Sequence, residues 1–212
     1  MTLWRWLGVP MPDAWIPHTE PSTIAIRSRE KLLVWGGSTV TGQFAIQLAA
    51  QAGLDVIAVC SESTTSLVSA LGAKHVVSYT GKTDMYIIEE IVSLAQGNLT
   101  KAIDLVGSQT ARLVLQVIGA CGTQVDFAPL AFMSSKDLVP NNAVVHTVEM
   151  KQFVLDPEST KYGVQLNRVI EQGLVKIPKL RLLSGGWEGI EPGLKVLRNR
   201  ELRGEKLIIP LF

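Results

Sequence analysis

A glycine-rich joint between a short apolar run and a helix-like segment constrains the fold of this chain more than any other feature. The run Leu32–Trp35 is apolar throughout, as expected for a strand buried on both faces, and it stops at Gly36 and Gly37. Apolar side chains then recur at helical spacing over residues 41–53, where the final glycine is well placed to end a helix. This strand, turn and helix predict the first unit of an α/β sheet.

The same alternation of apolar runs and helix-like segments continues through the next eighty residues, with short glycine-marked joints. Regular alternation of this kind is typical of a doubly wound parallel α/β sheet of the Rossmann type, with right-handed crossovers. The further predicted strands are 55–60, 75–79, 102–106 and 123–127, and the predicted helices are 64–71, one from Asp84 onward, and 111–118.

Two flanking regions have weaker patterns. The first thirty residues are rich in Pro and Trp, so we predict an N-terminal arm or linker over residues 1–30. Residues 31–212 are predicted to form one Rossmann-like domain with a C-terminal extension. Its last predicted elements are a strand over 143–148, a helix over 159–172, and an edge strand over 207–211 that contains Pro210.

Composition and charge exclude several classes of protein. The chain has 212 residues, of which 47% are hydrophobic, and its 20 basic side chains nearly balance its 19 acidic ones. This balance gives no field that would attract nucleic acid, and no apolar run is long enough to span a membrane. Two cysteines without a CxxC pattern and three dispersed histidines suggest neither a disulfide framework nor a metal site. We therefore expect a cytoplasmic protein without a bound metal.

The glycine-rich joint has the order of a dinucleotide-binding loop. Gly37 takes the place of the first glycine of such a loop and Gly42 that of the third, whereas Thr39 occupies the middle position. The Thr39 hydroxyl is a candidate hydrogen-bond donor to a phosphate, and the backbone amides from Val40 to Gly42 would begin a helix that points at the same site. The alternative is that the glycines serve a sharp turn in an α/β protein that binds no cofactor.

The end of the second predicted strand bears on the choice of cofactor. A carboxylate at this tip would hold the ribose 2′-hydroxyl of NAD, but the tip residue is Ser61. A small hydroxyl is more compatible with the 2′-phosphate of NADPH. However, no Lys or Arg follows directly, and Glu62 would repel a phosphate.

Four segments of the sequence resemble the medium-chain dehydrogenase/reductase superfamily, and most closely the fungal trans-acting enoyl reductases that work beside polyketide synthases. They are LLVWGGSTVTGQFAIQLA, DVIAVCS, LGAKHVVSY and LRGEKLIIPL. The resemblance implies that Ser61 and Tyr79 flank the 2′-phosphate of NADPH, and that the strand end at Phe127 lies near the nicotinamide. The residues that it implies for the pyrophosphate are Ser38, Thr39, Val40 and Thr41.

The sequence departs from this family in two ways. Glu62, Ser63 and Thr64 stand where the family has Pro, Lys and Asn. In addition, the resemblance implies a preceding β-rich catalytic domain that supplies half of the active-site cleft, and we expect this chain to lack it. The expected function is then an NADPH-binding, enoyl-reductase-like tailoring protein of a fungal polyketide pathway, truncated to its cofactor domain.

A second functional hypothesis stays open at this point. The chain could be a cofactor-independent cyclase or isomerase that binds an apolar polyketide in the emptied cleft. The candidate catalytic residues for it are Asp126, at a predicted strand end, and His146 on an apolar strand. A solvated or capping role for Asp126 is the alternative. The expected partners are a polyketide synthase and a second copy of the chain, paired through the edge strand at 143–148.

Overall fold

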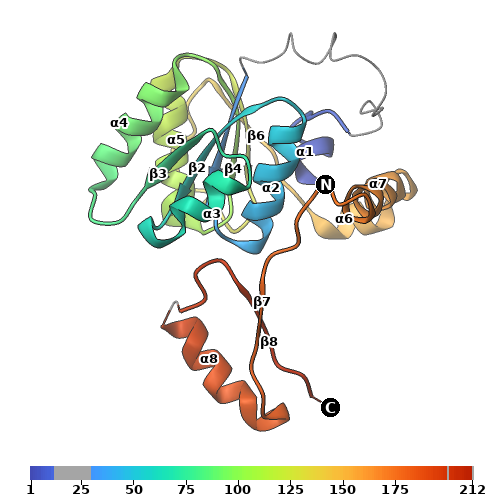
Figure 1. Cartoon of the computed structure of the whole chain (residues 1–212). Helices are drawn as coiled ribbons and strands as arrows, with labels where there is room; N and C mark the ends of the chain where they lie inside the picture. Colours follow the sequence, from blue (N-terminus) through green and yellow to red (C-terminus); the bar gives the residue numbers. More distant parts are fainter. Residues whose placement is uncertain (12–29, 200, 212) are drawn as a thin grey trace.

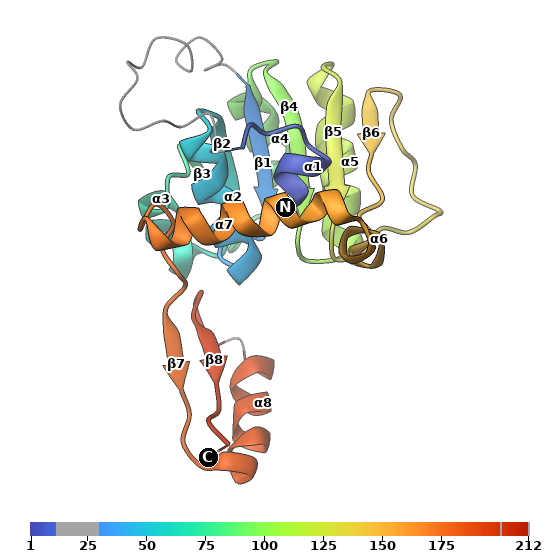
Figure 2. The same ribbon diagram turned by 90° about the vertical axis from the view of Figure 1, so that its right-hand side faces the viewer.

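The computed structural model describes residues 1–11, 30–199 and 201–211. Within these residues the main sheet (Figure 1) has six parallel strands in the order β3-β2-β1-β4-β5-β6, which can be followed in Figure 2. This is the order of a doubly wound Rossmann sheet, so the predicted fold class is confirmed. The strands are β1 (Lys31–Trp35), β2 (Asp55–Cys60), β3 (His75–Ser78), β4 (Leu99–Asp104), β5 (Val125–Pro129) and β6 (Ala143–Val145).

Helices cover both faces of this sheet. In Figure 2 α7 (Thr160–Glu171) and α1 (Thr2–Arg5) cross the near face, while α4 (Asp84–Ala95) and α5 (Ser108–Cys121) lie behind it. The core is accordingly divided into two apolar clusters, one on each face. The remaining helices that flank the sheet are α2 (Val40–Gln51), α3 (Thr65–Ala70) and α6 (Met150–Leu155).

Strand β1 explains why the apolar run before the glycines has no polar residue. Leu32 and Val34 pack into the cluster that contains α2, whereas Leu33 and Trp35 pack into the cluster beneath α4 and α5. All four side chains are buried. Because successive strand residues point to opposite faces, a strand covered on both sides requires an uninterrupted apolar run.

The N-terminal residues belong to the core rather than to an arm. Leu3, Trp4 and Leu7 are at most 6% exposed and join the apolar cluster on the α2 face. The Trp4 ring stacks on Tyr162 of α7 with centroids 6.3 Å apart. The predicted arm therefore has to be corrected over residues 1–11, because apolar side chains on one turn of helix gain more by packing on the sheet than by facing water. The rest of it, with Trp15 and His18, lies outside the described residues.

The C-terminal region forms a small unit, of which only the last strand was predicted from the sequence. Strand β7 (Leu180–Leu182) pairs in parallel with β8 (Lys206–Ile208), and α8 (Ile190–Arg198) connects them. Figure 2 shows that this unit projects beyond the carboxyl ends of the main strands. Helix α8 was missed because Pro192 and Gly193 interrupt its pattern, although Pro is tolerated in a first helical turn.

No helix among the described residues is long and apolar enough to cross a membrane.

Candidate nucleotide-binding site

The turn from β1 into α2 is built from glycines for which side chains have no room. Gly36 has φ +90°, and the backbone N–H groups of Gly36 and Gly37 both donate to the carbonyl of Val59, at 3.1 and 2.9 Å. A Cβ added to Gly42 would lie 2.3 Å from the Gly36 carbonyl oxygen. Helix α2 therefore packs directly on the turn, which is the role of the third glycine in a dinucleotide-binding loop.

Thr39 has a different role from the one predicted for its hydroxyl. Its side chain caps α2: Oγ1 accepts from the Gly42 N–H at 3.0 Å and donates to the Gly36 carbonyl at 2.8 Å. The single hydroxyl proton is thereby used within the turn, so Thr39 is not a side-chain donor to a phosphate. It instead holds the turn and the helix start in one geometry.

The start of α2 leaves backbone donors for a ligand. Among the described residues, the N–H groups of Ser38, Val40 and Thr41 have no hydrogen-bond partner. The first N–H groups of a helix are without intrahelical partners, and the positive end of the helix dipole lies beside them. These amides are the part of the predicted pyrophosphate site that the structure leaves accessible.

A cavity of about 540 Å³ opens beside this turn. This volume lies in the range of small-molecule sites. Trp35 and Ser38 line it from the turn, Tyr79 comes from the end of β3, and Val106 and Leu113 come from the segment after β4. The Cys60 thiol also lines it, and burial raises the pKa of this thiol, so that it is a neutral group there.

A smaller cavity of about 200 Å³ adjoins the first and shares Ser38 and Tyr79 with it. Ser61, Ser63 and Thr64 line it from the end of β2, and the Ser61 hydroxyl lies 3.0 Å from that of Thr64. The structure thus brings Ser61 and Tyr79 to one cavity, as the sequence analysis expected. Glu62 is not among its lining residues.

The C-terminal unit supplies a residue that the sequence analysis missed. Arg203, in the turn before β8, lines the same small cavity as Ser61. The residues that directly follow Ser61 contain no Lys or Arg, whereas Arg203 lies far along the chain. The sequence LRGEK before the last strand contains Arg203 and belongs to the resemblance described above. However, no feature of the neighbouring sequence indicates that this segment lies beside the end of β2.

Phe127 does not face the site. Its side chain is fully buried within the cluster on the α4 and α5 face, and it lines neither of the two cavities described above. Strand β5 runs to Pro129 rather than ending at Phe127, so the predicted strand end moves by two residues. The Phe127 side chain therefore belongs to the core, and the position of the nicotinamide near this strand end stays a prediction.

Asp126 and His146 do meet, but on the face of the sheet. His146 Nε2 lies 2.9 Å from Asp126 Oδ1. In the register of the sheet, Asp126 lies opposite Lys101 of β4, near the start of β5. Pro129, the last residue of β5, is three residues further on, which corresponds to about 10 Å along a strand. Asp126 is therefore not at the carboxyl end of its strand, where the sequence analysis placed it.

Asp104 shapes the loop that carries Val106 into the larger cavity. Its side chain is fully buried, and Oδ2 accepts from the Gly107 N–H at 3.1 Å. Burial raises the pKa of this carboxyl, although the hydroxyl of Thr110 and the backbone of Gly107 oppose the shift. These contacts give Asp104 a structural part in the site.

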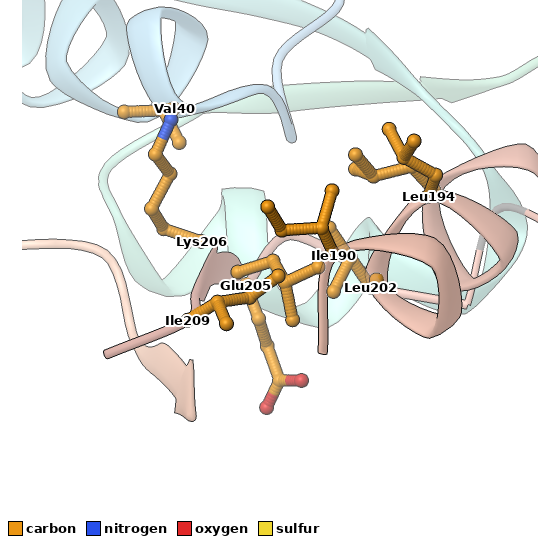
Figure 3. Close-up of a pocket in the computed structure, with 10 residues that line it drawn as sticks. Val40, Ile190, Leu194, Leu202, Glu205, Lys206 and Ile209 are labelled. Carbon is orange, nitrogen blue, oxygen red and sulfur yellow. The ribbon is translucent and has the colours of Figure 1, made fainter. Parts of the chain in front are cut away.

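A third cavity, of about 450 Å³, lies between the C-terminal unit and α2 (Figure 3). Most of its lining side chains are apolar: Ile190 and Leu194 come from α8, and Val40 at the start of α2 lies across from them. No hydroxyl-bearing side chain lines it, and its charged side chains are those of Glu205 and Lys206.

Comparisons with known proteins agree with this architecture. A family profile described as zinc-binding dehydrogenase matches residues 41–161. Trans-enoyl reductase traG of Penicillium crustosum is 31% identical over 212 residues, which cover 91% of this chain and 57% of traG. The chain therefore spans little more than half the length of this relative.

Solved structures share the fold at low sequence identity. The CurK enoyl reductase superposes with a TM-score of 0.65 at 16% identity, covering 85% of this chain and 55% of that protein. Escherichia coli quinone oxidoreductase, solved in complex with NADPH, gives a TM-score of 0.64 at 17% identity and covers 85% of this chain and 57% of that one. Likeness at this level concerns the fold alone.

The family description names zinc, which proteins bind through groups of His, Cys, Asp and Glu side chains. Across residues 1–11, 30–199 and 201–211, no group of three or more His, Cys, Asp or Glu side chains could hold a metal ion. The described residues therefore do not fit a bound zinc ion.

Proposed function

Because this chain belongs to the zinc-binding dehydrogenase family of the medium-chain dehydrogenase/reductase superfamily, we propose that it is the NADPH-binding part of an enoyl reductase. One observation carries the proposal. The glycine turn, the 540 Å³ cavity and the hydroxyl-lined cavity form a continuous series, joined through Ser38 and Tyr79. In doubly wound sheets such a series, at the carboxyl ends of the strands, is where dinucleotides bind.

The residues present fit a dinucleotide. The free amides of Ser38, Val40 and Thr41 bind the pyrophosphate at the start of α2. The apolar walls at Val106 and Leu113 take the adenine ring. No carboxylate lines the small cavity among the described residues, so nothing there matches the acidic contact that NAD requires. When bound, NADPH supplies the hydride that reduces a carbon–carbon double bond.

The relatives described as trans-enoyl reductases support an enoyl substrate. The resemblance of the sequence to the fungal trans-acting enoyl reductases extends the proposal to an enoyl thioester on an apolar, polyketide-like chain, presented by a polyketide synthase in the cytoplasm. Pairing of two copies through the edge strand β6 stays part of the proposal.

No observation favours the cofactor-independent cyclase or isomerase. Its two candidate residues lie on the sheet face, near the start of β5, rather than beside either cavity at the turn.

Calorimetric titration of the 212-residue chain with NADPH and NADH tests the proposal. We expect saturable binding of both and preference for NADPH. Val106 is half exposed and lines the larger cavity, so Val106→Trp places a bulky side chain in the volume proposed for the adenine ring. The substitution should weaken the binding of both cofactors by about tenfold or more. Val139→Trp is the matched control, because Val139 is similarly exposed and lines a different cavity. Absence of binding, or equal binding by both variants, would reject the nucleotide site.

A second measurement concerns turnover. Hydride transfer requires the nicotinamide and the acceptor within about 3–3.5 Å in an enclosed, aligned pose. The described residues line the site from one side, so we expect this chain by itself to oxidise NADPH with an enoyl thioester only slowly. Rapid, stoichiometric reduction would show that the chain encloses its substrate without further help.

A further inference from the structure

We infer that Arg203, delivered by the C-terminal unit, is the cation that binds the 2′-phosphate of NADPH and sets the preference over NADH. This inference rests on the proposed function. It names a specificity-determining residue that lies far along the chain from the β2 segment it serves.

The chemistry of the small cavity indicates an anion. Hydroxyl groups and one guanidinium line it, and no carboxylate among the described residues does so. Arg203 has no ion-pair or hydrogen-bond partner within the described residues, so its charge is available to a ligand. A planar guanidinium is suited to phosphate because it donates two parallel hydrogen bonds.

Two other cations lie near these cavities. Lys206 lines the third cavity, with Val40, and not the small one. Lys82 lines the larger cavity, but its ammonium pairs with Glu90 at 2.6 Å and lies 5.1 Å from the centre of the Tyr86 ring. Among the described residues, Arg203 is therefore the one Lys or Arg that lines the small cavity.

The position of the small cavity identifies which phosphate it would take. It begins at Ser61, directly after β2, which is where the ribose 2′-position lies in a Rossmann fold. It also shares Ser38 and Tyr79 with the adenosine-sized cavity. A nucleoside in the larger cavity would thus project a 2′-phosphate toward Arg203.

The backbone of the Arg203 turn is held in place by the phosphate loop. The amide of Gln43, a buried residue of α2, donates to the Ser38 carbonyl at 3.0 Å and to the Gly204 carbonyl at 2.6 Å. Gly204 approaches α3 so closely that an added Cβ would lie 2.4 Å from Leu67 Cδ2. One side chain therefore couples the C-terminal turn to the turn that binds the pyrophosphate.

Arg203 also has a backbone conformation that non-glycine residues seldom adopt. Its φ is +43°, in the left-handed region. Strained residues of this kind are concentrated at ligand-binding positions, where the surrounding structure holds them. The strain is consistent with an arginine retained for its charge.

The test is calorimetric titration of the wild type, Arg203→Ala and Arg198→Ala with NADPH, NADH and 2′,5′-ADP. We expect Arg203→Ala to raise the dissociation constants of NADPH and 2′,5′-ADP by about 10- to 100-fold, which is the range for a lost charge-assisted hydrogen bond. The dissociation constant of NADH should stay within about twofold of the wild-type value. Arg198→Ala removes the same charge from an exposed position on α8 that lines neither cavity, and should change nothing.

Arg203→Gly guards against a folding defect, because glycine accepts the left-handed backbone without strain. It should reproduce the loss of NADPH affinity with an unchanged melting temperature. Hydrogen exchange gives a readout that is independent of affinity: NADPH should protect residues 202–207 in the wild type, and NADH should not.

The outcomes separate the two proposals. If Val106→Trp abolishes binding of both cofactors while Arg203→Ala and Arg203→Gly leave NADPH affinity within twofold, the nucleotide site stands and the role of Arg203 is rejected. If the wild type binds neither cofactor, the proposed function and this inference both fail. Equal weakening of NADPH and NADH by Arg203→Ala would also overturn the inference, because only NADPH carries the 2′-phosphate.

Discussion

The main sheet and the C-terminal unit are built from the same connection, a strand, a helix and a parallel strand, but they differ in how far their apolar side chains are buried. In β1 every side chain is buried, and helices lie on both faces. In β7, by contrast, Leu182 is 66% exposed, and α8 leaves Leu194 58% exposed. Parallel strands are stable when both faces are covered, and the C-terminal unit has only its own helix among the described residues. Its position thus depends on attachment to the larger domain.

Helix α2 provides much of that attachment through two buried glutamines. Gln43 reaches the carbonyl of Gly204, and Gln47 exchanges hydrogen bonds with the backbone of Lys176 at 2.7 and 3.0 Å. The helix that begins at the phosphate loop therefore also holds both ends of the C-terminal unit. We therefore expect mutations in the main sheet to lower the free energy of unfolding, and mutations at the attachment to affect mainly the local order of the C-terminal unit.

The largest effect is expected from truncating the buried core. Phe127→Ala should lower the free energy of unfolding by about 3–5 kcal/mol, because it removes a fully buried ring and leaves a cavity. Leu194→Ala, in the exposed C-terminal helix, should change it by no more than about 0.5 kcal/mol. Urea unfolding followed by circular dichroism measures both. Comparable losses would mean that the C-terminal unit is as tightly packed as the sheet.

An intermediate effect is expected from detaching the C-terminal turn. Gln43→Met should cost about 1–3 kcal/mol, since it leaves the carbonyls of Ser38 and Gly204 without their shared donor. Hydrogen exchange should rise over residues 202–207 while β1 keeps its protection.

Gln116→Met, an exposed substitution on α5, serves as the control for this variant. If exchange at the turn were the same in both variants, contacts other than Gln43 would hold the unit in place.

The smallest effect concerns the attachment of α1 and its dependence on pH. The hydrogen bond from Arg5 holds the pKa of Asp156 below its ordinary value of 3.8. A lowered carboxyl pKa stabilises the folded state above the unfolded value, and this contribution is lost as the pH falls through the folded pKa. Asp156→Asn should therefore melt slightly below the wild type at pH 7, and the difference should vanish in acid.

Glu158→Gln, at an exposed neighbouring position, should show no such convergence. Exchange at residues 202–207 should not respond to either substitution, because α1 contacts the main domain. A difference between Asp156→Asn and wild type that persists at low pH would contradict this account of the pair.

Much of the main domain could be predicted from the sequence because its signals are local. The apolar run of β1, the helical spacing of α2 and the glycines between them are each decided by neighbouring residues, and the structure has these elements within two residues of their predicted bounds. The uninterrupted apolar character of β1 even indicated that both of its faces are covered. Helix α8 could not be predicted in the same way, because Pro192 and Gly193 hide a pattern that only the pairing of β7 with β8 completes.

By itself, then, the sequence determined the alternation of strands and helices and the geometry of the glycine turn, since both follow from side-chain periodicity and backbone freedom over a few residues. The tertiary structure alone decided which distant side chains meet. The strand register puts Asp126 near the start of β5, and Trp4 is buried in the core. The Gln43 amide binds the backbone of the turn that contains Arg203, and this turn lies beside the end of β2. The physical reason is that burial and hydrogen bonding act between surfaces, and surfaces form only after elements far apart in the chain have packed together.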